Sequence, residues 1–288
     1  MREDINDNEI RRIGGTTPQG NNKRKWPFVV IAAVLLLVVT VIMVHIFSGT
    51  SDTEVDGIYE PQPATKQATH PLRAWLYAQD SIALSGCATM DTIVNDIAVR
   101  IYLPLNARPA LEIGMRPLLD NRVILALQAA DIRADNQKIV GAFVEKGKPV
   151  AWGLSKKGYC AILHDSVYVG MADNSPLFEE ATDCGGFFFR QYPLVADGVP
   201  QESELKTQSV RRALCEVEEH ICVIETKDRS SMHDFTVLLA DLEVNNAIYL
   251  IGSDAMGTVT DLDGTRTQLG NLVEKPYKNT NFIYWTRK

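Results

Sequence analysis

Hydrophobic residues first gather in one long run, from Pro27 to Phe47, which contains no charged residue. A helix of that length rises 1.5 Å per residue and spans the roughly 30 Å hydrocarbon core of a bilayer. Most of the run is Val, Ile, Leu or Phe, and each favours insertion by about 0.3 to 0.6 kcal/mol near the membrane centre. The pattern predicts one transmembrane helix over residues 27–47.

Charges flank this run unequally. Lys23, Arg24 and Lys25 precede it, whereas acidic residues predominate after it as far as His70. Because positive charge stays on the cytoplasmic side, the N-terminus is expected in the cytoplasm and the rest of the chain in the periplasm or outside the cell. A cleaved signal peptide is the alternative, but its apolar region typically has about 7–15 residues and ends at small residues.

The chain therefore divides into four expected parts. Residues 1–26 form a cytoplasmic tail, residues 27–47 the helix of a single-pass inner-membrane protein, and residues 48–70 a polar linker. Neither polar segment has enough apolar side chains to fold alone. Residues 71–288 carry aromatic and aliphatic side chains throughout and are expected to form one exported domain.

Short apolar runs bounded by turn residues outnumber helical patterns in that domain. The segments 143–153, 162–170 and 209–226 each contain a polar turn between two apolar runs and predict β-hairpins. A final strand is expected within 278–286. The expected fold class is α+β, with the transmembrane helix followed by one β-rich mixed α/β domain.

One helix has a clear pattern. In residues 231–244 the apolar side chains recur at helical spacing, and Ser231 can cap the helix with Asp234 in its first turn. Asn245 and Asn246 end it, and an apolar strand follows up to Gly252. A strand, this helix and a strand predict a β-α-β-like unit within the domain.

The composition argues against several classes of partner and cofactor. The formal net charge is −7, and the charge is more negative after the basic tail, which disfavours nucleic acid as a partner. Five cysteines are too few for a disulfide scaffold and are expected to be mostly buried and apolar, with one or two disulfides as the alternative in an oxidising compartment. No standard metal or cofactor signature is present, so we predict no metal and no cofactor.

Two segments place charged side chains directly beside apolar runs. Asp131 and Arg133 follow the apolar run 123–130, an arrangement that suits either a ligand site or a solvated loop. The segment TDCGGFFFRQYPLVADG combines the Gly185-Gly186 pair and three phenylalanines with Arg190 and Asp197. Such a segment suits either a sugar pocket or an ordinary core.

The segment SVRRALC places Arg211 and Arg212 in an expected strand, where successive side chains point to opposite faces. One of the two guanidinium groups should therefore face inward and needs a partner, because an unpaired buried charge costs several kcal/mol. A structural carboxylate and a bidentately bound phosphate are both suitable partners.

Four segments together resemble the phosphodiester glycosidase family, over roughly residues 123–252. VILALQAADI stands where the family has a strand ending in Asn-Gly-Gly-Phe-Phe, and YPLVADG is similar to its Leu-Val-x-Asp/Asn-Gly segment. VRRALC resembles its Arg-Thr-Ala-Ile-Gly strand, and HDFTVLLADLEVNNAIYLIGS its helix followed by Leu-Asp-Gly-Gly-Gly-Ser. This chain departs from the family at Gln128, Ala129 and Ala130, and at Ile251, which replaces the family's aspartate.

The resemblance implies a membrane-anchored hydrolase that cleaves a sugar 1-phosphodiester, such as an N-acetylglucosamine 1-phosphodiester, at the glycosidic bond. That chemistry uses carboxylates and a clamp for the phosphate. Arg211 falls on the family's arginine, and Gly252 is the retained glycine of its last motif. The candidate catalytic residues are Asp131, Asp197 and Asp254, and the candidate substrate-binding residues are Arg211, Arg190, Arg133, Gln128 and Gly252.

A non-catalytic envelope module is the alternative on the same scaffold, because the aspartate and glycines of the last family motif are missing here. Such a module would bind a glycan, a sugar phosphate or a protein partner. A scaffold whose transmembrane helices assemble is a third possibility, but residues 27–47 contain no GxxxG pattern. Carboxylates converging on Arg211 in one cleft would favour the enzyme.

Overall fold

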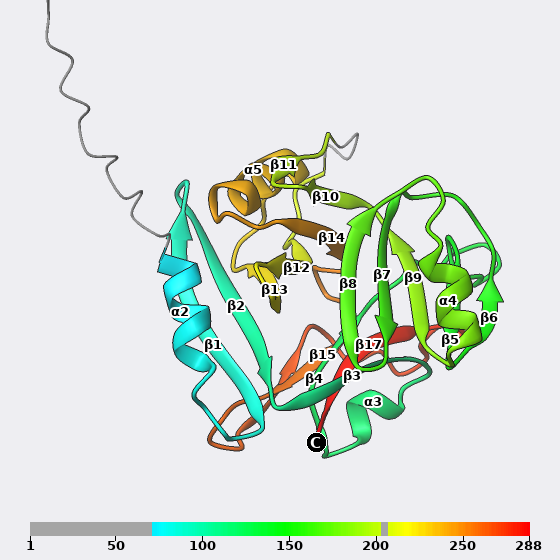
Figure 1. The fold of residues 1–288 in the computed structure, drawn as a ribbon, viewed down its shortest axis with the longest axis horizontal. Helices are drawn as coiled ribbons and strands as arrows, with labels where there is room; N and C mark the ends of the chain where they lie inside the picture. Colours follow the sequence, from blue (N-terminus) through cyan, green and yellow to red (C-terminus); the bar gives the residue numbers. More distant parts are fainter. Residues whose placement is uncertain (1–70, 203–206) are drawn as a thin grey trace, which may run out of the picture. The chain divides into compact units, whose positions relative to one another are not determined.

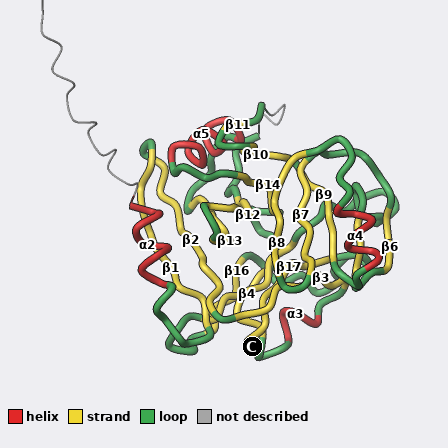
Figure 2. The backbone as a smooth tube through the Cα atoms, in the orientation of Figure 1, coloured by secondary structure: helices red, strands yellow, loops and turns green. Residues whose placement is uncertain are grey.

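The computed structural model of the protein describes residues 71–202 and 207–288. The predicted transmembrane helix over residues 27–47, its basic tail and the linker lie outside these residues. No helix within the described ranges is long and apolar enough to cross a membrane. The described part is a mixed α/β fold, rich in strands and with few helices (Figure 1, Figure 2), as predicted for the domain.

One sheet has seven strands in the order β1-β2-β13-β12-β14-β10-β11, and each pairing is antiparallel. Its members are β1 (Gly86–Val94), β2 (Ile97–Leu105), β10 (Pro193–Ala196), β11 (Val199–Pro200), β12 (Arg212–Val217), β13 (His220–Thr226) and β14 (Asn246–Leu250). The β12–β13 hairpin predicted within residues 209–226 is confirmed.

The β-α-β unit is present in a split form. Helix α5 (Met232–Asp241) connects β13 to β14, and β12 lies between these two strands and is antiparallel to both. Strands β13 and β14 therefore run parallel. Ser231 caps α5 as expected, because its Oγ accepts a hydrogen bond from the Asp234 backbone N–H at 3.0 Å.

Two helices cover one face of this sheet. Helix α2 (Pro71–Gln79) buries Leu72 and Leu76 completely, and α5 buries Phe235 and Leu239 in the same apolar cluster. The pattern analysis did not predict α2, which is short and has an exposed face.

Two five-stranded antiparallel sheets complete the fold, in the orders β16-β15-β4-β17-β3 and β6-β5-β9-β7-β8 (Figure 1). The first contains β3 (Ala107–Ile113), β4 (Val123–Gln128), β15 (Gly257–Thr260), β16 (Arg266–Leu269) and β17 (Asn281–Arg287). The second contains β5 (Phe143–Glu145), β6 (Lys148–Ala151), β7 (Gly158–Leu163), β8 (Ser166–Met171) and β9 (Phe187–Gln191). The hairpins β5–β6 and β7–β8 and the final strand β17 confirm predictions.

The three sheets share one core. Leu214 of the seven-stranded sheet, Leu125 of the second and Phe189 of the third are all fully buried in one apolar cluster. The outer faces of the smaller sheets carry the helices α3 (Arg116–Leu119) and α4 (Leu177–Asp183). All five cysteines are free; four are buried, as expected, and Cys184 is exposed.

This packing brings the ends of two strands from different sheets together. The backbone N–H of Ile251, directly after β14, donates to the carbonyl oxygen of Gln128 at the end of β4, at 3.3 Å. Two of the four segments that carry the family resemblance, at β4 and after β14, therefore meet at one place.

Candidate functional site

A hollow of about 710 Å³ opens where β4 and β14 end. Gln128 and Ile251 contribute to its wall at the strand ends, and Asp131, Lys156 and Tyr192 contribute from neighbouring segments. Its volume lies within the range of roughly 300–1,000 Å³ that is usual for small-molecule sites.

Two residues of the lining, Lys156 and Asp131, form an ion pair. The Lys156 ammonium group pairs with the Asp131 carboxylate and donates to Oε1 of Gln191 at 3.0 Å. The Gln191 amide in turn donates to Asp131 Oδ1 at 2.9 Å. The Lys156 ammonium also lies 4.3 Å from the centroid of the Tyr192 ring, within cation–π range. One carboxylate, one amide and one ring thus hold a single cation.

Burial sets the electrostatics of this cation. It lowers the pKa of Lys156 below the ordinary lysine value, and the Asp131 charge only partly opposes this shift. Burial and the Asp131 charge both raise the pKa of the Tyr192 hydroxyl. Lys156 also has a φ of +71°, a conformation that costs a non-glycine residue on the order of 1 kcal/mol and that is often found at functional sites.

The segment between β16 and β17 adds a second cation to the hollow. It contributes Lys275 and Tyr277 to the lining, and both are exposed. Two backbone donors anchor it: Asn271 N–H donates to the Asp254 carbonyl at 3.0 Å, and Lys278 N–H to Gln137 Oε1 at 2.9 Å. The hollow therefore combines two lysines and two tyrosines with apolar side chains.

Three of the residues predicted for the site lie at or next to this hollow. Gln128 and Asp131 line it. Gly252 is buried beside it, and a Cβ at that position would lie only 2.4 Å from the Val210 carbonyl oxygen, so close packing requires the glycine. Asp254 is exposed in the following turn and is not part of the lining.

The other predicted residues lie elsewhere. Arg211 is buried, and its guanidinium donates to the backbone carbonyls of Ser230, at 3.1 Å, and Thr207. Arg190 is also buried and donates to three carbonyls. Arg133 is an exposed loop residue paired with Asp135. None of these three arginines lines the hollow at the ends of β4 and β14, so the expected phosphate clamp is not assembled there.

The candidate catalytic aspartates are also not gathered in one cleft. Asp197 is exposed in the turn between β10 and β11 and lines a different, acidic hollow with Glu216 and Glu218. Asp131 lines the hollow described above, where it is already paired with Lys156. The structure therefore brings Gln128 and Asp131 together and leaves Asp197 apart.

Pattern analysis missed Lys156, Gln191 and Tyr192. Lys156 belongs to the turn LSKKG before β7, which has no periodicity that distinguishes it from a solvated turn. Gln191 directly follows the predicted Arg190, and alternation along β9 would have suggested that the two point to different sides. That alternation was the one available signal.

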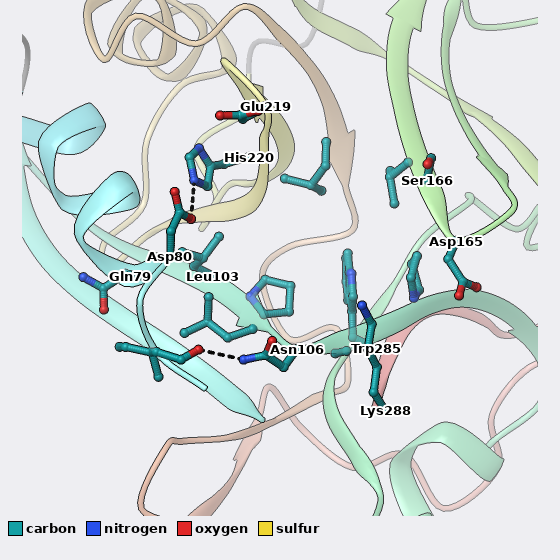
Figure 3. A pocket seen from close by; sticks show the side chains of 17 residues that line it. Gln79, Asp80, Leu103, Asn106, Asp165, Ser166, Glu219, His220, Trp285 and Lys288 are labelled. Carbon is teal, nitrogen blue, oxygen red and sulfur yellow. Dashed lines mark hydrogen bonds and ion pairs between the residues drawn. The ribbon is translucent and has the colours of Figure 1, made fainter. Parts of the chain in front are cut away.

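A separate hollow of about 440 Å³ lies between α2 and the β7–β8 turn (Figure 3). On one side His220 Nε2 lies 2.9 Å from Asp80 Oδ1, and on the other are Asp165 and Ser166. The Asn106 amide donates to the carbonyl of Ile82 at 2.8 Å. Several of its polar groups thus serve the scaffold, and none of the predicted site residues lines it.

Comparisons with known proteins show little similarity. No family model matches the chain, and no curated protein matches it in sequence. Among solved structures, the zebrafish N-acetylglucosamine-1-phosphodiester alpha-N-acetylglucosaminidase catalytic domain, auto-inhibited by its pro-peptide, has a TM-score of 0.48 and 14% identity, over 73% of this chain and 85% of that chain. A hypothetical protein from Synechocystis has a TM-score of 0.46 and 10% identity, over 70% and 62%. These similarities carry no argument about function.

Proposed function

We propose that the hollow at the ends of β4 and β14 binds a carbohydrate that carries a negative charge, with a sugar 1-phosphate as the candidate ligand. The described domain then acts as a binding module and does not hydrolyse its ligand. The observation that carries this proposal is the charge of the lining, which contains two cations, Lys156 and Lys275, and one carboxylate, Asp131.

The lining supplies complementary groups for both parts of such a ligand. An ammonium group attracts a phosphate as a point charge, and Lys156 is held at the hollow by Asp131 and Gln191. Tyrosine rings and apolar side chains offer faces for a sugar ring, and Gln128 offers both a donor and an acceptor for its hydroxyl groups. The sequence resemblance to a family that acts on sugar phosphodiesters supports the same ligand class.

Hydrolysis of a glycosidic bond normally needs two carboxyl groups on either side of the bond, about 5 to 9.5 Å apart. The lining of the hollow includes only Asp131, and this carboxylate is neutralised by Lys156. Asp254 lies outside the lining, and Asp197 lines another hollow. These positions favour binding over catalysis.

Membrane anchoring belongs to the same proposal and rests on the sequence alone. A helix over residues 27–47, with the basic residues on its cytoplasmic side, would hold the binding domain at the outer surface of the inner membrane. The module would then take up a sugar phosphate or a phosphorylated glycan of the cell envelope.

Calorimetric titration of the full-length chain tests the proposed ligand. We expect saturable binding of N-acetylglucosamine 1-phosphate and weaker binding of N-acetylglucosamine, which lacks the anion. Equal affinity for the two would contradict the role of the lysines. Incubation with an N-acetylglucosamine 1-phosphodiester should release no free sugar, and release that depends on Asp131 would establish the enzyme instead.

A further inference from the structure

A further hollow, of about 450 Å³, lies beside the start of β12 and the end of β13. Its lining includes Arg100, Tyr102, Arg212, Glu225, Lys227 and Gly270. It shares no lining residue with the hollow proposed to hold the sugar phosphate.

Positive charge exceeds negative charge around this hollow. Arg212 is buried, pairs with Glu225 and donates to the Ile251 carbonyl at 2.9 Å. Arg100 and Lys227 share the single carboxylate of Asp91, with a separation of 2.7 Å in each pair. The lining of the hollow thus holds three cations and one carboxylate, Glu225.

The Tyr102 hydroxyl supplies a neutral donor at the same place. The Tyr102 side chain is 2% exposed and lines the hollow. Burial raises the pKa of Tyr102, and the nearby Glu225 charge adds to this shift, so the phenol keeps its proton at neutral pH. A phenol that keeps its proton can donate a hydrogen bond to an anion in the hollow.

We propose that this hollow is a second anion site, which binds inorganic phosphate or the phosphate group of a small monoester. The anion would accept a hydrogen bond from Tyr102 and would lie beside the three cations that line the hollow. The hollow is large enough for such a group, and cationic side chains bind phosphate oxygens through charge-assisted hydrogen bonds. The site goes beyond the sugar-phosphate site and does not depend on it.

Nuclear magnetic resonance of the full-length chain, with ¹³C at the Cζ atom of tyrosine, tests this site directly. The signal absent from Y102F is assigned to Tyr102, and the signal absent from Y192F reports on the other hollow. Inorganic phosphate is titrated against sodium chloride at equal ionic strength. We expect a saturable shift of the Tyr102 signal with phosphate alone. A shift no larger than that in chloride would overturn the proposal.

A matched pair of lysine variants gives a second test. K227Q removes a cation of this hollow, and K157Q removes an exposed lysine that is likewise paired with an aspartate, Asp173. We expect K227Q to weaken phosphate binding at the Tyr102 signal by about tenfold and K157Q to leave it unchanged. Equal effects of the two variants would contradict the site. An unresponsive Tyr192 signal with N-acetylglucosamine 1-phosphate would instead count only against the proposed function.

Discussion

The start of β12 and the hollow at the ends of β4 and β14 both hold buried cations, but they use them differently. At β12, Arg211 donates to backbone carbonyls, so its charge serves the scaffold. At the hollow, Lys156 is held by side chains that line an open space. A cation is available to a ligand when its partners border a hollow, and burial alone does not make it so.

The largest effect is expected from removing an arginine that serves the scaffold. Arg190→Ala leaves the carbonyls of Lys156, Ala172 and Asp173 without their donor, at a cost of about 3 kcal/mol or more. The exposed Arg133→Ala should cost less than about 0.5 kcal/mol. Urea unfolding of the two variants measures the difference. A stable Arg190→Ala protein that no longer bound ligand would make Arg190 the clamp after all.

Removing the cation of the hollow should affect binding more than folding. Lys156→Met should weaken binding of N-acetylglucosamine 1-phosphate by roughly 10- to 100-fold, because a charge-assisted contact with the phosphate is lost. Lys157→Met changes the neighbouring lysine, which pairs with Asp173 at the surface, and should leave the affinity unchanged. Calorimetry on both variants decides whether Lys156 contacts the ligand.

A smaller effect is expected at the exposed lysine of the hollow. Lys275→Ala should weaken the same binding about threefold, because solvent and salt screen an exposed charge. Lys278→Ala, in the same segment but outside the lining, is the control. The difference between the two variants should shrink at high ionic strength, and a difference that salt leaves unchanged would argue against a direct charge interaction.

The smallest effect is expected in the pH dependence of ligand affinity and of stability. Because the pKa of Lys156 is lowered, affinity for the anion should begin to fall at a pH below the ordinary lysine pKa of about 10.4. Over the same window the free protein should gain stability, since the unfolded chain binds the proton more tightly than the folded one does. Titrations and unfolding across this range should show both trends, and Lys156→Met should show neither.

Local patterns predicted much of the fold and little of the site. The hairpins β5–β6 and β7–β8 and the cap of α5 were predicted, because alternation, turn residues and capping act within a few positions. The assembly of three sheets depends on contacts between distant segments, such as Ile251 with Gln128. The sequence shows that Arg211 is charged. It does not show that the guanidinium group donates its hydrogen bonds to backbone carbonyl oxygens.

In the candidate site, too, the sequence predicted what depends on a local motif and missed what depends on distant segments. Gln128 and Asp131 were found because they lie on a motif that ends a strand, whereas Lys156, Tyr192 and Tyr277 come from three segments that only the tertiary structure brings together. No periodicity links these three positions, so the sequence alone carried no signal that they share a hollow.

A crystal structure of the protein with N-acetylglucosamine 1-phosphate tests the central claim most directly. We predict the phosphate within hydrogen-bonding distance of the Lys156 ammonium group, with the sugar intact and between Gln128 and Tyr277. A ligand at the His220 hollow, with the space beside Lys156 empty, would contradict the account, as would a cleaved product beside Asp131.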